Sequence, residues 1–180
     1  MKRTRNCSKK HHLGLGIYAD VPDDHEAVKH TPKVFLASDT RRVYTWHIYN
    51  GERSANLKAK FFKKGAGSKA DSVNAIFDSG AQSVCLKESI CEKLGLVSVG
   101  EANVSGATGS DKSKIYKCSV KLECALIDNN PDEMRQDLYF KDVFVWGITL
   151  PGHTDALIGW PIIKSGEFSI DHGLEVSLAY

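Results

Sequence analysis

The chain has 180 residues, of which 42% are hydrophobic and 9% aromatic, which is the composition of a globular protein with one domain and a tail. Five of its 24 Lys and Arg residues lie within residues 1–12, which hold no acid, so the rest of the sequence has 19 basic and 22 acidic side chains. This balance excludes a basic nucleic-acid-binding body and leaves only the basic head, residues 1–12, as a segment that could contact nucleic acid.

The apolar runs and the cysteines indicate in which cellular compartment the protein is expected. The apolar runs are far shorter than the ~18 residues that a membrane span needs, and the stretch 13–17 is too short and glycine-interrupted for a signal peptide. The five cysteines are an odd number without a CxxC pair, which predicts reduced thiols rather than a disulfide framework or a metal site. We therefore expect a cytoplasmic protein that contacts no membrane and needs no metal or organic cofactor.

The first third of the chain divides into a tail and two strands. Residues 1–40 show no sustained periodicity and predict an irregular basic N-terminal tail or leader. Residues 43–49 are rich in β-branched and aromatic side chains and end at Asn50-Gly51, a turn signal, so a strand at 57–62 could pair with them. The glycines of 65–68 indicate a flexible joint before the motif-bearing core, residues 70–180.

The core consists of short predicted strands with little helix. A strand at 72–77 leads into Asp78, a second follows at 84–86, and a short helix is expected over 87–94 because Ile90 and Leu94 share one face and Gly95 can end it. The remaining strands are expected at 99–104, 114–127, 138–148, 168–170 and 175–178, the last two as a terminal hairpin. This pattern predicts an all-β fold with one or two short helices, a closed barrel or a sandwich, in a domain of residues 41–180.

Asp78-Ser79-Gly80-Ala81 is the stretch that points to chemistry. An acid at the end of the apolar strand Ala75-Ile76-Phe77 is costly unless it is paired or hydrogen-bonded. Ser79 and Gly80 allow a tight turn and the close approach of another chain. An ordinary turn in which Asp78 serves only as a cap has the same four residues, so the stretch needs a second motif.

The second motif lies about eighty residues downstream, where the apolar strand Ala156-Leu157-Ile158 ends at Gly159 and a further apolar segment follows. An Asp-(Ser/Thr)-Gly-Ala turn, then a glycine-rich hairpin, then an apolar-apolar-Gly strand resembles the retroviral-type aspartic proteases, or retropepsins. The resemblance covers roughly residues 70–180 and is nearer to the small retropepsin-like proteins of bacteria and mobile elements than to a viral enzyme.

This resemblance implies an aspartic endopeptidase with a closed-barrel half site. Such an enzyme needs two carboxylates that share one proton, and no second Asp-(Ser/Thr)-Gly occurs here, so a homodimer would supply one Asp78 from each subunit. By the same resemblance Ser79, Gly80 and Ala81 support the catalytic loop, and Ile158 and Gly159 pack beneath it. The flap that covers an extended polypeptide substrate would then consist of Ser105, Gly106, Ala107, Thr108 and Gly109.

The sequence departs from the family after Gly159. Relatives commonly continue with Arg or Met and then Asp or Asn, whereas this chain has Trp160-Pro161. Proline has no N–H and no charge, so the ion pair or helix cap that the acid supplies is missing here. This departure bears on how subunits pack more than on the chemistry.

Two other functions stay open at this point. A catalytically inactive dimer with the same fold could act as a peptide-binding or scaffold module, for which no ionisable group is needed at position 78. In the second alternative, the function lies in the basic head, residues 1–12, which tethers the domain to nucleic acid. The histidines and the Gly14/Gly16 pair lack metal-ligand or phosphate-loop spacing.

Overall fold

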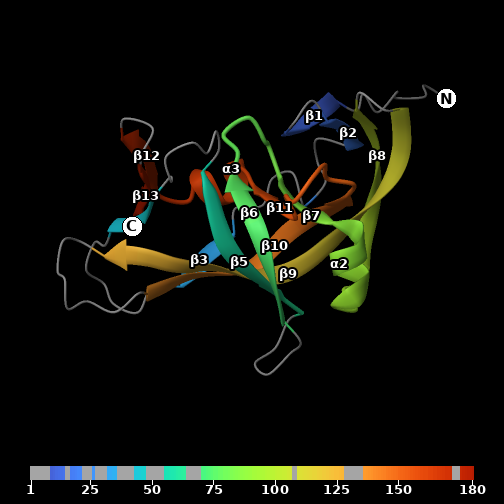
Figure 1. The fold of residues 1–180 in the computed structure, drawn as a ribbon. Coiled ribbons are helices and arrows are strands. Elements are labelled where there is room, and N and C mark those ends of the chain that lie inside the picture. The colour runs from blue at the N-terminus through green and yellow to red at the C-terminus, as the bar shows by residue number, and fades with distance from the viewer. Residues whose placement is uncertain are drawn as a thin grey trace.

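Strands make up most of the described chain in this computed structural model (Figure 1). The structure describes residues 9–14, 17–21, 26, 32–35, 43–47, 55–63, 70–106, 109–127, 136–171 and 175–180. The strands are β1 (Lys9–Gly14), β2 (Ile17–Val21), β3 (Lys33–Phe35), β4 (Val43–His47), β5 (Asn56–Phe62), β6 (Ala70–Phe77), β7 (Val84–Lys87), β8 (Ser98–Gly106), β9 (Gly109–Ile127), β10 (Gln136–Ile148), β11 (Ala156–Ile158), β12 (Glu167–Asp171) and β13 (Glu175–Ala179). The helices are α2 (Glu88–Lys93) and α3 (Trp160–Ile163), so the expected mainly-β class is confirmed.

Six strands close into a ring. In order around it they are β9, β5, β6, β11, β7 and β10, and β10 pairs again with β9. Closure removes the free sheet edges that would otherwise leave backbone groups unpaired. The predicted closed barrel is confirmed.

The shortest strand of the ring, β11, comes from late in the chain and lies between β6 and β7. It pairs parallel with β6, placing Ile158 beside Phe77, and antiparallel with β7, placing Leu157 beside Cys85. Its three residues are fully buried, as expected for a strand that is flanked on both edges and covered on both faces. The end of β6 and the end of β11 therefore lie next to each other.

The barrel interior is filled by alternating side chains. In β5 the residues Leu57, Ala59 and Phe61 point inward and are buried, whereas Lys58 and Lys60 point toward solvent. Full burial of a Leu or Phe side chain contributes about 1.5–3 kcal/mol. The largest fully buried side chains of the fold are Trp146, Tyr44, Phe61, Phe140, Leu86, Ile115, Leu122, Leu138, Leu157, Ile158 and Ile162.

The helix α2 follows β7 and packs on the outside of the barrel (Figure 1). Glu88 in its first turn and Lys93 in its last turn have the charges that the helix dipole favours. Cys91 and Leu94 are buried against the barrel, and Gly95, with φ of 65°, ends the helix in the left-handed conformation that glycine adopts at no cost. The predicted helix over 87–94 is confirmed.

Two expectations for the N-terminal third are wrong. The strand β5 pairs with β6 and β9, not with β4, which pairs instead with β13 and β9. A turn signal predicts where a strand ends but not which strand lies beside it. Residues 1–40 were expected to be irregular, yet β2 pairs with β8 and β3 with β10. The division into a tail (1–40) and a domain (41–180) stays a prediction.

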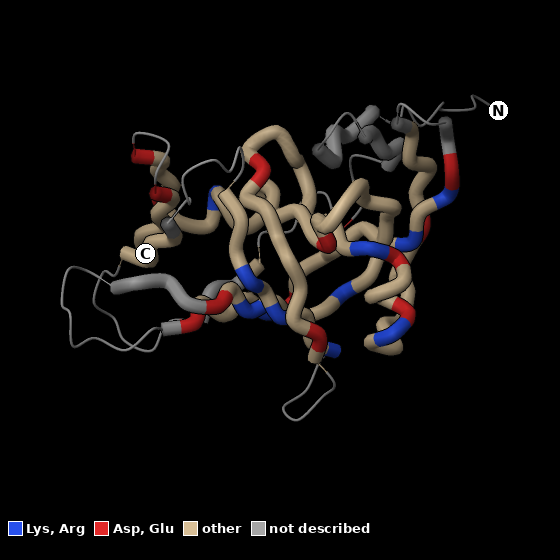
Figure 2. The backbone as a smooth tube through the Cα atoms, viewed as in Figure 1, with Lys and Arg blue, Asp and Glu red and all other residues tan. Residues whose placement is uncertain are grey.

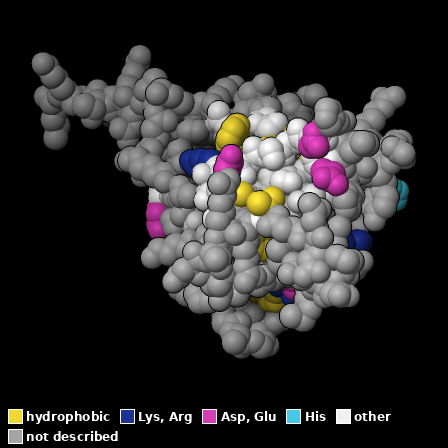
Figure 3. All heavy atoms as spheres, turned by 90° about the vertical axis from the view of Figure 1, so that its left-hand side faces the viewer, with side chains coloured by type: hydrophobic (Ala, Val, Ile, Leu, Met, Phe, Trp, Pro, Cys, Tyr) yellow, Lys and Arg dark blue, Asp and Glu magenta, His cyan; other side chains and the backbone are white. Residues whose placement is uncertain are grey.

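The terminal hairpin of β12 and β13 extends the fold on the left of Figure 1, as predicted, and β13 continues through β4 into a side sheet. The face on that side presents acidic and apolar side chains close together (Figure 3). On β12, Ile170 is 55% exposed next to Asp171.

Charges are interleaved over the described part of the molecule. Lys and Arg alternate with Asp and Glu along the barrel strands and around α2 (Figure 2), without a large region of one sign among the described residues. None of the described helices is long and apolar enough to cross a membrane.

Candidate active site

The centre of the site is the turn that follows β6. Phe77 is the last buried residue of the strand. Its N–H donates to the carbonyl of Ala55, which ties the end of β6 to the residue just before β5. The N–H of the next residue, Asp78, donates to the carbonyl of Ile158 at 3.1 Å. The acid therefore stands at the point where β6 leaves the sheet, with its backbone fixed to β11.

The side chain of Asp78 is held as well. Its Oδ1 accepts a hydrogen bond from the N–H of Gly80 at 2.9 Å, and its carbonyl accepts one from Ala81 at 3.0 Å. These bonds form a tight turn with the carboxylate folded over its own backbone. Asp78 is half-buried, so the group is oriented by the protein and still reaches the surface.

The three residues after Asp78 divide into an outer and an inner part. Ser79 and Gly80 are exposed, whereas Ala81 is completely buried. The carbonyl of Ala81 accepts a hydrogen bond from the N–H of Trp160 at 2.9 Å. Ser79 and Gly80 thus form the accessible tip of the turn, and Ala81 anchors it to the start of α3.

Gly159 lies where the end of β11 meets the turn. A Cβ at this position would lie 2.5 Å from the carbonyl oxygen of Ala81 and would also collide with the carbonyl oxygen of Ser83. Both obstacles are backbone atoms, so only glycine allows this approach. The structure therefore brings Ile158 and Gly159 directly against the Asp78 turn.

The predicted flap falls in the hairpin between β8 and β9. Ser105 pairs with Ser110 and Gly106 pairs with Gly109, so the two strands run together to the tip. The tip residues Ala107 and Thr108 lie outside the described residues. The other edge of β8 pairs with β2, with Tyr18 beside Ser105.

A buried thiol lies near the acid. Cys85 on β7 is completely buried, and this burial, reinforced by the charge of Asp78, raises the pKa of the thiol far above its usual range. The thiol stays protonated at any working pH and does not add a second negative charge beside the carboxylate. Cys85 is thus inert filling behind the turn and not a nucleophile.

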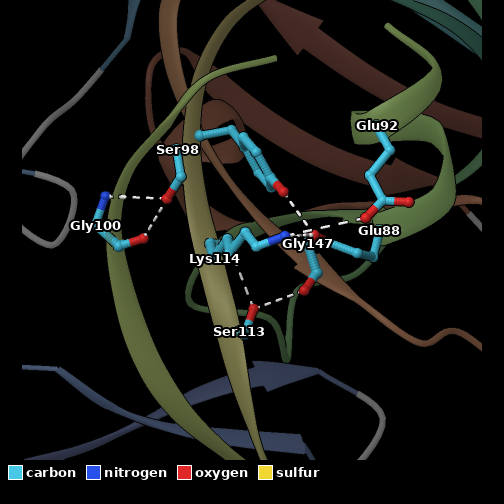
Figure 4. Close-up of polar contacts among 8 residues, drawn as sticks. Glu88, Glu92, Ser98, Gly100, Ser113, Lys114 and Gly147 are labelled. Atoms are coloured by element: carbon cyan, nitrogen blue, oxygen red, sulfur yellow. Dashed lines mark hydrogen bonds and ion pairs between the residues drawn. The ribbon is translucent and has the colours of Figure 1, made fainter. Parts of the chain in front are cut away.

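Sequence reasoning missed a polar cluster that ties α2 to the barrel (Figure 4). Glu88 accepts hydrogen bonds from Tyr116 at 2.6 Å and from Lys114 at 3.2 Å. Burial, followed by the bond to Glu88, raises the pKa of Tyr116, so the phenol remains a donor. The other carboxylate oxygen of Glu88 is buried against Gly147 without a hydrogen-bond partner among the described residues.

This cluster belongs to the scaffold rather than to the acid turn. Its other member, Ser113, donates to the carbonyl of Gly147 at 2.6 Å and joins β9 to β10 (Figure 4). A sequence signal that could have found it is the pair of polar residues Ser113 and Lys114, at the start of the strand predicted over 114–127. Within the described ranges, no three His, Cys, Asp or Glu side chains lie close enough together to hold a metal ion.

Comparisons with known proteins give a likeness of fold among solved structures. No family model and no curated protein matches the chain. Among solved structures, the chain is similar to the crystal structure of a retropepsin-like aspartic protease from Rickettsia conorii, with 16% sequence identity and a TM-score of 0.46. The match covers 81% of this chain and 97% of that one.

Proposed function

We propose that the protein is an aspartic endopeptidase whose active form is a homodimer with one Asp78 from each subunit. The observation that carries the proposal is the way Asp78 is presented: its backbone is bonded to Ile158, its carboxylate to the N–H of Gly80, and the turn projects from a closed barrel.

The chemistry follows from two carboxylates within hydrogen-bond reach of each other. Like charges at that distance cannot both ionise, so the pair holds one proton. The protonated acid polarises the carbonyl of the scissile peptide bond, while the ionised acid takes a proton from the attacking water. Because each chain supplies one Asp-Ser-Gly turn, two turns must meet across a two-fold axis.

The polypeptide substrate would bind in an extended conformation by strand addition between the acid turns and the hairpins of β8 and β9. Ser79 and Gly80 are exposed at the tip of the turn and would lie closest to the second subunit and to the substrate backbone. Gly106 and Gly109 let the hairpin close over the peptide and exclude water.

The test compares Asp78→Asn with Asp71→Asn. Asp71 lies on the same strand but pairs with Lys93 of α2, away from the turn. Wild type and Asp71→Asn should cleave an unfolded polypeptide best at acidic pH, and Asp78→Asn should lose roughly 10³-fold or more while keeping the wild-type circular dichroism spectrum. Equal cleavage by Asp78→Asn would end the protease proposal. Peptide binding without cleavage by the wild type would instead support the inactive, peptide-binding dimer.

A further inference from the structure

The carboxylate of Asp155, just before β11, bridges the two strands that flank β11. Its Oδ2 accepts a hydrogen bond from the N–H of Asn74 on β6 at 3.1 Å, and its Oδ1 accepts one from Nζ of Lys87 on β7 at 2.8 Å. The backbone repeats the bridge, since the N–H of Asp155 donates to Asn74 and the N–H of Lys87 donates to Asp155. One residue thus fixes the start of β11 to both neighbours.

The other end of β11 carries the contacts that hold the acid turn. Only three residues separate Asp155 from Gly159, and the last of them, Ile158, accepts the hydrogen bond from the N–H of Asp78. A strand this short, fully buried and paired on both edges, moves as one piece. A change in its register at Asp155 therefore shifts the carbonyl that fixes Asp78.

We propose that Asp155 is a positioning residue, whose ionised carboxylate holds β11 in register and thereby fixes the Asp78 turn for catalysis. The inference rests on the proposed function for its effect on activity, but its effect on the turn can be measured without any activity. It assigns a role to an acid that lacks the Asp-Ser-Gly context.

The charges around Asp155 set the pH at which its carboxylate takes up a proton and no longer fixes β11. Partial burial raises the pKa of Asp155, but the hydrogen bonds from Lys87 and Asn74 outweigh it, and the pKa is lowered from its usual value of 3.8. Lys58 on β5, bonded to the Asn74 side chain at 2.5 Å, adds a second nearby positive charge. His153, on the same loop, is exposed.

The lowered pKa of Asp155 decides whether its carboxylate stabilises the fold more at high or at low pH. Because the folded protein binds this proton less readily than the unfolded chain, the carboxylate stabilises the fold fully above its unfolded pKa. That contribution is lost as the pH falls through the folded value, below 3.8. The turn should therefore loosen at the acid end of the range in which an aspartic protease works.

Two variants separate the contribution of the Asp155 carboxylate from that of its partner Lys87. Lys87→Gln keeps the carboxylate and removes its main positive partner, so the pKa of Asp155 should rise. Asp155→Asn removes the titrating group and points an amide N–H₂ at one of two donors, so the turn should be loosened at every pH. Lys93→Gln is the matched control, because it breaks a different Lys–Asp pair, the one between Lys93 of α2 and Asp71 on β6.

The experiment uses the full chain carrying Asp78→Asn, so that no catalytic dyad contributes to the titration. The backbone amide signals of residue 78 and Ile158 are followed by NMR from pH 6 to 2.5. We expect one titration step below pH 3.8, moved to higher pH by Lys87→Gln, absent in Asp155→Asn and unchanged by Lys93→Gln. A step that ignores Lys87→Gln, or that persists in Asp155→Asn, would overturn the proposal.

A second readout uses the chain with Asp78 intact. The acid limb of kcat should move upward by the same amount in Lys87→Gln, while the alkaline limb and KM stay near the wild-type values. Should Asp155→Asn fail to fold, Lys87→Gln still decides the question because it leaves the other bonds of Asp155 in place. Absence of activity in the wild type would refute the protease and leave the NMR titration to judge Asp155.

Discussion

The α-carbon of Gly159 lies so close to the carbonyl oxygen of Ala81 that an added Cβ would stand 2.5 Å from it. The contact joins the acid turn to the end of β11, two segments that are far apart in the sequence and adjacent in the sheet. It accounts for the glycine after the apolar strand on grounds of space alone, since its φ of −95° is open to any residue.

The first prediction concerns this contact. Gly159→Ala should destabilise the fold by about 3 kcal/mol, because the atoms that the methyl group meets are backbone carbonyls of Ala81 and Ser83, which cannot rotate away. For a chain of this size, such a loss lowers Tm by roughly 6–12 °C. Thermal unfolding followed by circular dichroism measures it, and a change in Tm of less than about 2 °C would contradict the packing described.

Gly147→Ala is the matched comparison. Here the added methyl group meets the carboxylate end of Glu88, a flexible side chain that can rotate away, and also lies 2.8 Å from a ring carbon of the buried Tyr116, which has to shift. The loss should be about 2 kcal/mol, because displacing Glu88 breaks the hydrogen bond that this charged acceptor receives from Tyr116. In the double variant Gly147→Ala/Glu88→Ala, which lacks the side chain that the methyl group displaces, the methyl group should add little to the effect of Glu88→Ala alone, and additive losses would show that the Tyr116 ring or the backbone has moved instead.

Assembly can be followed through tryptophan. Trp46 and Trp146 are 6% and 1% exposed, whereas Trp160 is 43% exposed. The backbone N–H of Trp160 donates to Ala81 of the acid turn. If two turns meet in the active dimer, the emission of Trp160 should shift to shorter wavelength as the concentration rises, in step with specific activity. Trp160→Phe identifies the signal. Constant specific activity at concentrations where sedimentation shows monomers would contradict a shared site.

The edge of β8 offers a further prediction. The strand β2 pairs with β8 at Ser105, Val104 and Asn103, in the hairpin where the resemblance places the flap. Removal of residues 1–21 should open this edge to an extended peptide and lower KM several-fold with little change in kcat. A synthetic peptide of residues 9–21 should then inhibit the shortened chain competitively. An increase in KM would mean that β1 and β2 support the hairpin instead.

Local patterns predicted the strand before Asp78, the helix that ends at Gly95 and the hairpin near residue 170, because each depends on neighbours in sequence. The neighbours of β4 and β5 were not predictable in this way, since their partners β13 and β9 are decided by closure of the sheet. Likewise, the bond between Glu88 and Tyr116 exists only after α2 has packed on β9. The turn motif could be located from sequence, but the roles of Asp155 and Gly159 in holding it required the register of β11.

The insertion of β11 between β6 and β7 has a consequence for biosynthesis. In the ring β6 and β7 do not pair with each other, because β11 lies between them. We therefore expect the ring to stay open beside Asp78 until residues 156–158 have left the ribosome. A nascent chain that reaches only residue 150 has every other strand of the ring but carries a slot lined with unpaired backbone groups. We therefore expect the acid turn to take its final geometry only when β11 has entered between β6 and β7, after the other strands of the ring have been made.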